Sequence, residues 1–264
     1  MCVWIPVLLA AVLAGPSSVA ATAPPAPSGW AVVAEYNSYA GRYADLPAGY
    51  ANSARIVTAL IRRGWPPDHI LLVRDSQDPA VLRHSVGWLA TRAHQGDVAL
   101  LYIAGEYQFF DKELMWDAAL PALWKQVSTS RRVLIVETCF AERLTAAVAG
   151  IPGLGLPAVG RDELDWWGLR DTGRVVRGGS FTYFLARALE SQAADTPPDF
   201  AAAFVTAVAG AQAYFHTVIS TAPAALGSFH ARGSYPERAA VFPNPHLVQG
   251  TGVPAAPQHA TSDP

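Results

Sequence analysis

The chain has 264 residues, of which 51% are hydrophobic and 15% are charged, and its formal net charge is −2. This composition supplies enough apolar material for a buried sheet covered by helices, and it excludes a disordered chain. The small net charge, without a run of Lys or Arg, argues against nucleic acid as a partner.

The N-terminal residues have the features of a secretory signal peptide. An apolar run over residues 4–14 is too short to span a bilayer, and small residues follow it. Cleavage after Ala20 or after Ala23 fits this pattern, and we take residues 1–23 as the signal peptide. Residues 24–29 then form a Pro-rich linker. We therefore expect a secreted or periplasmic protein with no stable membrane span after cleavage.

Strands and helices alternate through the first half of the chain. Apolar, β-leaning runs predict strands, and apolar positions at helical spacing predict helices. Strands are expected at 30–36, 69–74 and 97–103, and helices at 50–63 and 78–94. The run at 97–103 is almost wholly apolar, which is typical of a strand buried on both faces of a parallel sheet.

The second half continues this alternation. Its expected elements are a helix at 112–127, a strand at 132–138, a short helix at 141–149, a strand at 156–160 within an irregular segment, and helices at 180–192 and 198–215. The pattern predicts an α/β three-layer sandwich with a mostly parallel sheet of about six strands. We assign residues 30–247 to this one domain and residues 248–264 to a disordered tail.

Polar residues follow two of the expected strands. Glu106 comes shortly after the strand at 97–103, and Cys139 comes directly after the strand at 132–138. Ligands bind at the carboxyl ends of strands in open parallel sheets, so the two residues share one crevice if these strands are neighbours. Cys139 also precedes a helix, whose N-terminus favours a thiolate. A lone cysteine in an exported protein is either a reactive thiol or a small buried hydrophobe.

The order of these segments resembles that of the caspase and legumain families of cysteine peptidases. Residues 97–105 are similar to the strand that leads into the family's His-Gly dipeptide. Residues 132–141 are similar to the strand that ends in an acidic residue, one spacer and the nucleophilic Cys. The resemblance implies a caspase-like fold with Cys139 as the nucleophile. It places Glu106 at the position of the catalytic His and Tyr107 at the position of the next Gly, whose backbone N–H stabilises the oxyanion.

The same resemblance indicates where a substrate would bind. Residues 159–163 resemble a segment that carries substrate-pocket residues, so Asp162 and Glu163 are candidates, together with Glu137 before the nucleophile position. The alternative for Asp162 and Glu163 is a pair of solvated loop acids. The His and Cys residues lack zinc-ligand spacing, and no Gly-rich phosphate loop occurs, so we expect neither a metal nor a cofactor.

Glu106 at the histidine position predicts a weakened or inactive peptidase. A carboxylate beside a thiol disfavours the thiolate, and an ionised Glu has no proton to give to a leaving amine. Losing general acid–base help costs about 10²–10⁴ in rate. The first hypothesis is therefore an exported caspase/legumain-like protein that retains the binding of a peptide or protein. The alternatives are an active cysteine endopeptidase, in which Cys139 works with Glu106 or a distant His, and an unrelated α/β binding protein with Cys139 in its core.

Overall fold

The structure is a computed structural model that describes residues 28–41, 45–46, 49–76, 78–110, 116–165, 170–171, 174–175, 178–193, 196–221 and 246–250. The expected signal peptide, the linker up to residue 27 and the expected tail beyond residue 250 lie outside these residues.

A sheet of five parallel strands forms the centre of the molecule. The strands are β1 (Gly29–Glu35), β2 (Ile70–Arg74), β3 (Val98–Ala104), β4 (Arg131–Glu137) and β5 (Leu154–Pro157). They lie in the order β2-β1-β3-β4-β5, and β8 (Val248–Gln249) pairs antiparallel with the outer edge of β5. A separate two-stranded hairpin consists of β6 (Arg170–Asp171) and β7 (Arg174–Val175). The mostly parallel sheet is confirmed, with its sixth strand only two residues long.

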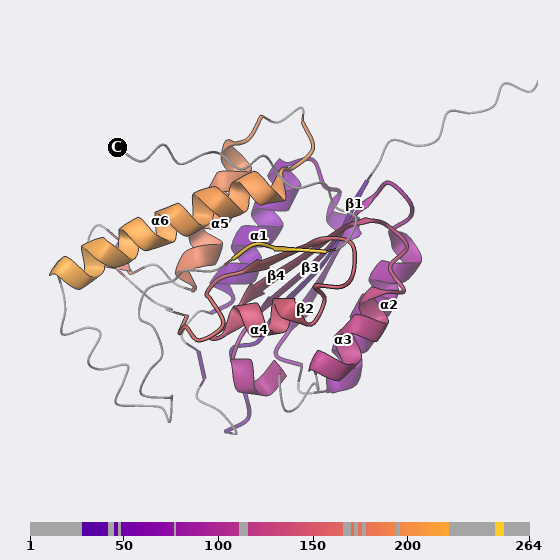
Figure 1. The fold of residues 1–264 in the computed structure, drawn as a ribbon, viewed down its shortest axis with the longest axis horizontal. Helices are drawn as coiled ribbons and strands as arrows, with labels where there is room; N and C mark the ends of the chain where they lie inside the picture. The colour runs from indigo at the N-terminus through magenta and orange to yellow at the C-terminus, as the bar shows by residue number, and fades with distance from the viewer. Residues whose placement is uncertain are drawn as a thin grey trace, which may run out of the picture.

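Helices cover both faces of the sheet (Figure 1). One face carries α1 (Ala51–Arg62), α5 (Ser180–Ser191) and α6 (Phe200–Thr221), and the other carries α2 (Pro79–Arg92), α3 (Trp116–Trp124) and α4 (Ala141–Ala146). A short 3-10 helix, η1 (Pro67–His69), leads into β2. The predicted three-layer α/β sandwich is therefore confirmed. Within the described residues, no helix combines the length and the apolar character needed to cross a bilayer.

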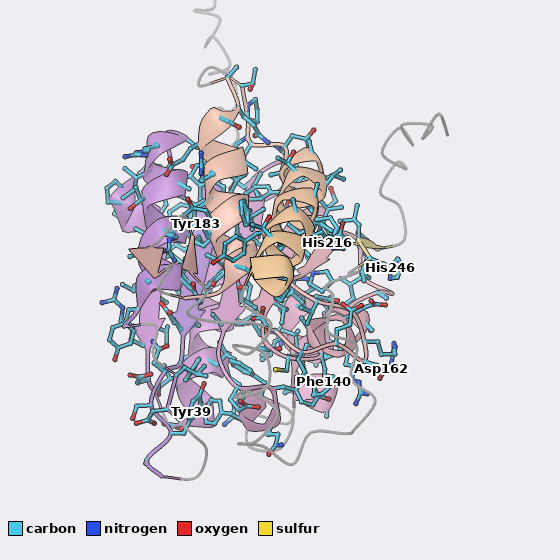
Figure 2. The ribbon with its side chains drawn as sticks, turned by 90° about the vertical axis from the view of Figure 1, so that its left-hand side faces the viewer. Tyr39, Phe140, Asp162, Tyr183, His216 and His246 are labelled. Carbon is cyan, nitrogen blue, oxygen red and sulfur yellow. The ribbon has the colours of Figure 1, made fainter. Side chains whose placement is uncertain are left out.

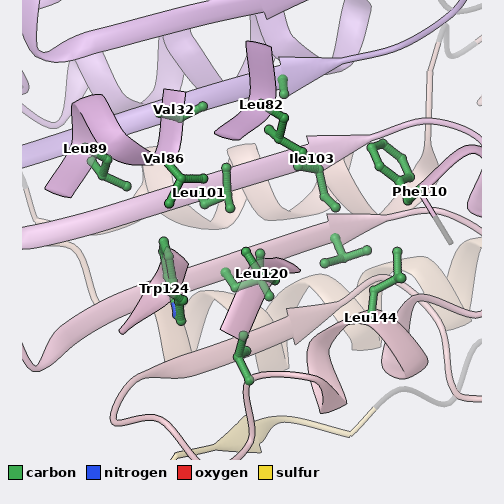
Figure 3. Close-up of a cluster of buried hydrophobic side chains, with 14 of the residues drawn as sticks. Val32, Leu82, Val86, Leu89, Leu101, Ile103, Phe110, Leu120, Trp124 and Leu144 are labelled. Carbon is green, nitrogen blue, oxygen red and sulfur yellow. The ribbon is translucent and has the colours of Figure 1, made fainter. Parts of the chain in front are cut away.

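The strand sequences divide the core into two halves. Successive side chains of a strand point to opposite faces, so Val32 and Ala34 of β1 pack under α2, α3 and α4, while Ala31 and Val33 pack under α1, α5 and α6. Figure 3 shows the first half, in which Leu89 of α2 and Trp124 of α3 reach the sheet. Apolar residues on both faces explain why these strands are continuous hydrophobic runs.

The structure departs from the sequence expectations at its short and C-terminal elements. Helix α6 runs to Thr221, beyond the expected end at 215, because no proline interrupts the chain before Pro223. Strand β5 begins at Leu154 and ends at Pro157, earlier than expected. The two-residue strands β6, β7 and β8 escaped prediction because two residues carry no periodicity.

A buried arginine fastens the connection between α5 and α6 to the end of α1. The Arg63 guanidinium, on a residue only 7% exposed, donates to the carbonyls of Gln192 (2.8 Å), Ala193 (2.5 Å) and Thr196. Because charged donors form the stronger hydrogen bonds, we expect Arg63→Met to lower the free energy of unfolding by about 3 kcal/mol in urea titration.

The neighbouring Arg62 gives a matched control for that substitution. Arg62 pairs with Glu190 at 2.6 Å, but its side chain is 63% exposed. Exposed pairs contribute about 0–1 kcal/mol, so Arg62→Met should have a small effect. Equal losses for the two substitutions would contradict the role given to Arg63.

Candidate active site

The carboxyl ends of the parallel strands, called here the carboxyl edge, hold strained backbone. Among the described residues, the non-glycine residues with positive φ are Ala40 (52°), Tyr50 (60°), Asp75 (47°) and Phe140 (55°). All four follow the carboxyl end of β1, β2 or β4. Such conformations cost about 1–3 kcal/mol each and cluster at functional sites. The carboxyl edge is therefore the place to look for a site.

The strand order brings Glu106 and Cys139 to this edge. Strands β3 and β4 are neighbours, and Ala104 pairs with Glu137 across them. Glu106 and Cys139 each stand two residues beyond this matched pair. The strand order reverses between β1 and β3, which is where ligands bind in open α/β sheets. The adjacency on which the shared crevice depends is thus present.

Cys139 lies in a tight turn between β4 and α4. Phe140 adopts the left-handed conformation, and its N–H donates to the Glu163 carbonyl at 2.8 Å. The residue is partly accessible, yet protein atoms crowd its thiol. Burial raises the pKa of the thiol well above the usual 9.0, and the charges of Asp165 and Glu106 raise it further. These effects outweigh the N-terminus of α4, which has only six residues.

An arginine on α4 connects the segments around Cys139. The Arg143 guanidinium donates to Asp162 Oδ1 at 2.5 Å, hydrogen-bonds with Tyr107, and lies 4.9 Å from the centroid of the Phe140 ring. The rings of Tyr107 and Phe140 meet edge-on at 5.3 Å. Figure 2 shows Asp162 and Phe140 near each other. We call Arg143, Asp162, Tyr107 and Phe140 the Arg143 clasp, because they join the segments that follow β3, β4 and β5.

Two tyrosines fix the segment that carries Glu106. The Glu106 N–H donates to Tyr39 Oη at 2.7 Å, and the Tyr39 hydroxyl donates to the Tyr36 carbonyl at 2.6 Å. Gly105 has φ 156°, and a Cβ at this position would lie 2.8 Å from Tyr39 Oη. Glycine therefore permits the close approach that places Glu106 and the following Tyr107.

Glu137, expected to bind substrate, faces the interior of the molecule. It is fully buried, and its Oε2 accepts the Thr182 N–H at 2.6 Å in the first turn of α5. Its Oε1 has no hydrogen-bond partner among the described residues. Burial, followed by the charge of Asp165, raises its pKa well above the usual 4.5. Glu35 has a similar position at α1, where its Oε2 accepts the Ser53 N–H at 2.7 Å. The contacts of Glu137 are those of a helix-capping group.

The other two expected substrate-binding residues lie in the loop after β5. Asp162 is exposed and pairs with Arg143. Glu163 is 9% exposed, and its Oε2 accepts the Gly160 N–H at 2.6 Å. Asp165, in the same loop, is buried and acts on the Cys139 thiol through its charge. The sequence did not single out Asp165, because no pattern in this irregular segment indicates which of its acids turns inward.

Among the histidines that the structure describes, His246 contacts the helix that follows Cys139. His246 Nδ1 lies 3.3 Å from Glu142 Oε2 on α4, three residues after Cys139. His216 lies on α6 (Figure 2). In the part of the chain that the structure describes, no group of three or more His, Cys, Asp or Glu residues is arranged to hold a metal ion.

Comparisons with known proteins bear on the fold alone. No protein-family model matches the chain, and no curated protein matches it. Among solved structures, the chain is similar to caspase-1 from Spodoptera frugiperda, with a TM-score of 0.45 and 13% sequence identity over 70% of this chain and 77% of that chain. We take neither the family nor the activity of the chain from this similarity.

Proposed function

We propose that the chain is an exported, caspase/legumain-like domain in which peptidase activity is weak or absent and the binding of a peptide or protein at the carboxyl edge remains. One observation carries the proposal. The thiol of Cys139 is crowded by protein and flanked by the charges of Asp165 and Glu106, which raise its pKa. A nucleophilic thiol needs the opposite surroundings, because the thiolate is the reactive form.

The acid–base partner supports the same conclusion. Peptide cleavage requires a proton for the leaving amine, and an ionised carboxylate at Glu106 has none to donate. The Tyr107 and Phe140 rings are already engaged with each other and with Arg143 in the Arg143 clasp. The site is therefore better suited to binding a peptide than to cleaving one.

A second candidate function is an active cysteine endopeptidase with a different histidine. The contact of His246 with Glu142 on α4 favours this histidine, because α4 begins two residues after Cys139. Under this alternative, cleavage of a peptide should disappear in both Cys139→Ala and His246→Ala. Under the first proposal, cleavage by the wild-type protein is weak or absent, and His246→Ala leaves it unchanged. If the chain is instead a binding protein of unrelated ancestry, with Cys139 as a core residue, cleavage should be absent and peptides should not compete with the labelling of Cys139.

The substitution Glu106→His tests the first proposal most directly. It removes one charge that raises the pKa of Cys139 and supplies an imidazole at the edge shared with the thiol. If the site descends from a peptidase, we expect cleavage of Arg-, Lys- or Asn-containing peptides to rise by about tenfold or more over the wild type, since acid–base help contributes about 10²–10⁴. Glu106→Gln is the control, because it removes the charge without adding an imidazole. Equal activity of the two variants would contradict the proposed ancestry.

Export is tested separately from the chemistry. The proposal expects the N-terminal sequence of the secreted or periplasmic protein to begin after residue 20 or 23. Recovery of the intact chain from the cytoplasm would contradict it.

A further inference from the structure

A cavity of about 410 Å³ lies at the end of the sheet opposite to Cys139. It sits where the strands β3, β4 and β5 begin and where α6 begins, and its apolar walls come from Val98, Val133, Leu154, Pro197, Pro198 and Phe200. Its volume falls within the range of about 300–1,000 Å³ that is typical of small-molecule sites. These apolar walls suit a single aliphatic side chain or a pair of them, and the rest of the lining is polar.

Three charged residues line this cavity. Arg132 is buried, and its guanidinium donates to the carbonyls of Pro152 and Val127, whereas Arg131 and Asp199 are exposed and carry opposite charges. Arg131 begins β4 on the same face as Val133, and its Nη1 donates to the Gly96 carbonyl at 3.1 Å. This bond engages one of the five guanidinium donors. Asp199 precedes α6, and its Oδ1 accepts the Ala202 N–H at 2.9 Å, which leaves Oδ2 as an acceptor. Arg131 and Asp199 form no ion pair with each other in the described structure.

We propose that this cavity binds a zwitterion with an apolar side chain, namely a free aliphatic amino acid or a dipeptide. The guanidinium of Arg131 would hold the carboxylate, since Arg matches a carboxylate with two parallel hydrogen bonds. The carboxylate of Asp199 would hold the ammonium group. The aliphatic side chain would lie against Val133, Leu154 and Phe200. A fatty acid would bring its carboxylate near Asp199, and an amine would bring its charge near Arg131, so each matches only one of these two exposed charges.

The inference is independent of the function proposed for Cys139. Arg131 and Glu137 mark the two ends of β4, and seven residues of a strand span about 20 Å. The cavity therefore lies on the order of 20 Å from the carboxyl edge. Binding in the cavity can be measured whether or not Cys139 is reactive.

Calorimetric titration of the full chain with four probes tests the proposal. The probes are L-leucine, leucyl-leucine, N-acetyl-leucine, which lacks the ammonium group, and leucinamide, which lacks the carboxylate. We expect leucine or leucyl-leucine to bind at least about threefold more tightly than either blocked compound, because each blocked form leaves one of the two exposed charges at the cavity without its partner.

Two variants test whether Arg131 binds the carboxylate of the ligand and Asp199 binds its ammonium group. Arg131→Gln should remove the preference for leucine over leucinamide, and Asp199→Asn should remove the preference over N-acetyl-leucine. Asn is a good N-cap, so Asp199→Asn preserves the start of α6. Arg62→Gln, on α1, is the control and should bind as the wild type does. Equal affinity of all four probes for the wild type, no binding at millimolar concentration, or a uniform loss for all probes in both variants would overturn the proposal.

Discussion

Replacing Asp165 by asparagine is expected to speed the alkylation of Cys139 by about tenfold at neutral pH. Burial is the main cause of the raised pKa of this thiol, and the charge of Asp165 is the next. Each unit by which the pKa falls multiplies the thiolate population about tenfold wherever the pH lies below the pKa. The measurement is the rate of reaction with iodoacetamide as a function of pH, with the unfolded chain as the reference.

The dependence of the Cys139 labelling rate on pH shows the direction in which the thiol pKa is shifted. In the wild type the thiol stays protonated at neutral pH, and its reaction rate should keep rising above pH 9.0, where an ordinary thiol levels off. In Asp165→Asn the whole profile should move to lower pH. A wild-type profile that levels off below pH 9.0 would contradict the surroundings described for Cys139.

Asp162 provides the matched control, because it lies in the same loop but pairs with Arg143 of the clasp. Asp162→Asn weakens the clasp without removing a charge that acts on the thiol. We expect this substitution to raise the labelling rate at every pH by a common factor, through easier access. A shift of the profile in Asp162→Asn and none in Asp165→Asn would reverse the roles assigned to the two acids.

Glu137→Gln is expected to make the protein more stable than the wild type above pH 4.5, by a margin that grows with pH. Burial and the charge of Asp165 raise the pKa of Glu137 above its usual 4.5, so the folded chain holds this proton more tightly than the unfolded chain. The stability that the proton contributes is complete below pH 4.5 and falls as the pH rises toward the folded pKa. The slope for one proton is at most about 1.4 kcal/mol per pH unit.

Glutamine copies the protonated form of Glu137 and still accepts the Thr182 N–H. Urea titrations of both proteins across this pH range therefore measure how much the Glu137 proton contributes to the free energy of unfolding. Glu137→Ala removes the cap of α5 and should be less stable than Glu137→Gln by about 2–3 kcal/mol at every pH, because neither variant has the titrating carboxyl. Parallel stability curves for Glu137→Gln and the wild type would show that Glu137 is ionised in the folded chain, contrary to the prediction.

The fold could be anticipated from the sequence to a large extent because its elements are long and periodic. The run at 97–103 and the run at 132–138 became β3 and β4, displaced by at most one residue. The helix expected from residue 78 begins there, and Asp78 caps α2, since its Oδ1 accepts the Ala80 N–H at 2.8 Å. Local chemistry determines such features, and local chemistry can be read along the chain.

Within the site, the sequence determined the positions of Glu106 and Cys139 at the ends of their strands. Their meeting at one edge needed the adjacency of β3 and β4, which only the tertiary structure decided. The sequence also indicated that a carboxylate opposes the thiolate. It did not indicate Asp165 or the Arg143 clasp, because these contacts join segments that follow different strands.

The distinction has a physical reason. Strand ends, helix caps and apolar periodicity depend on neighbours within a few residues, so the sequence by itself determined the sandwich and the location of Cys139. Burial, charge and the pKa of a thiol depend on which distant groups surround it, because electrostatic interactions act through space and strengthen when water is excluded. The tertiary structure therefore decided that Cys139 is a crowded thiol among acids, and that Glu137 caps a helix.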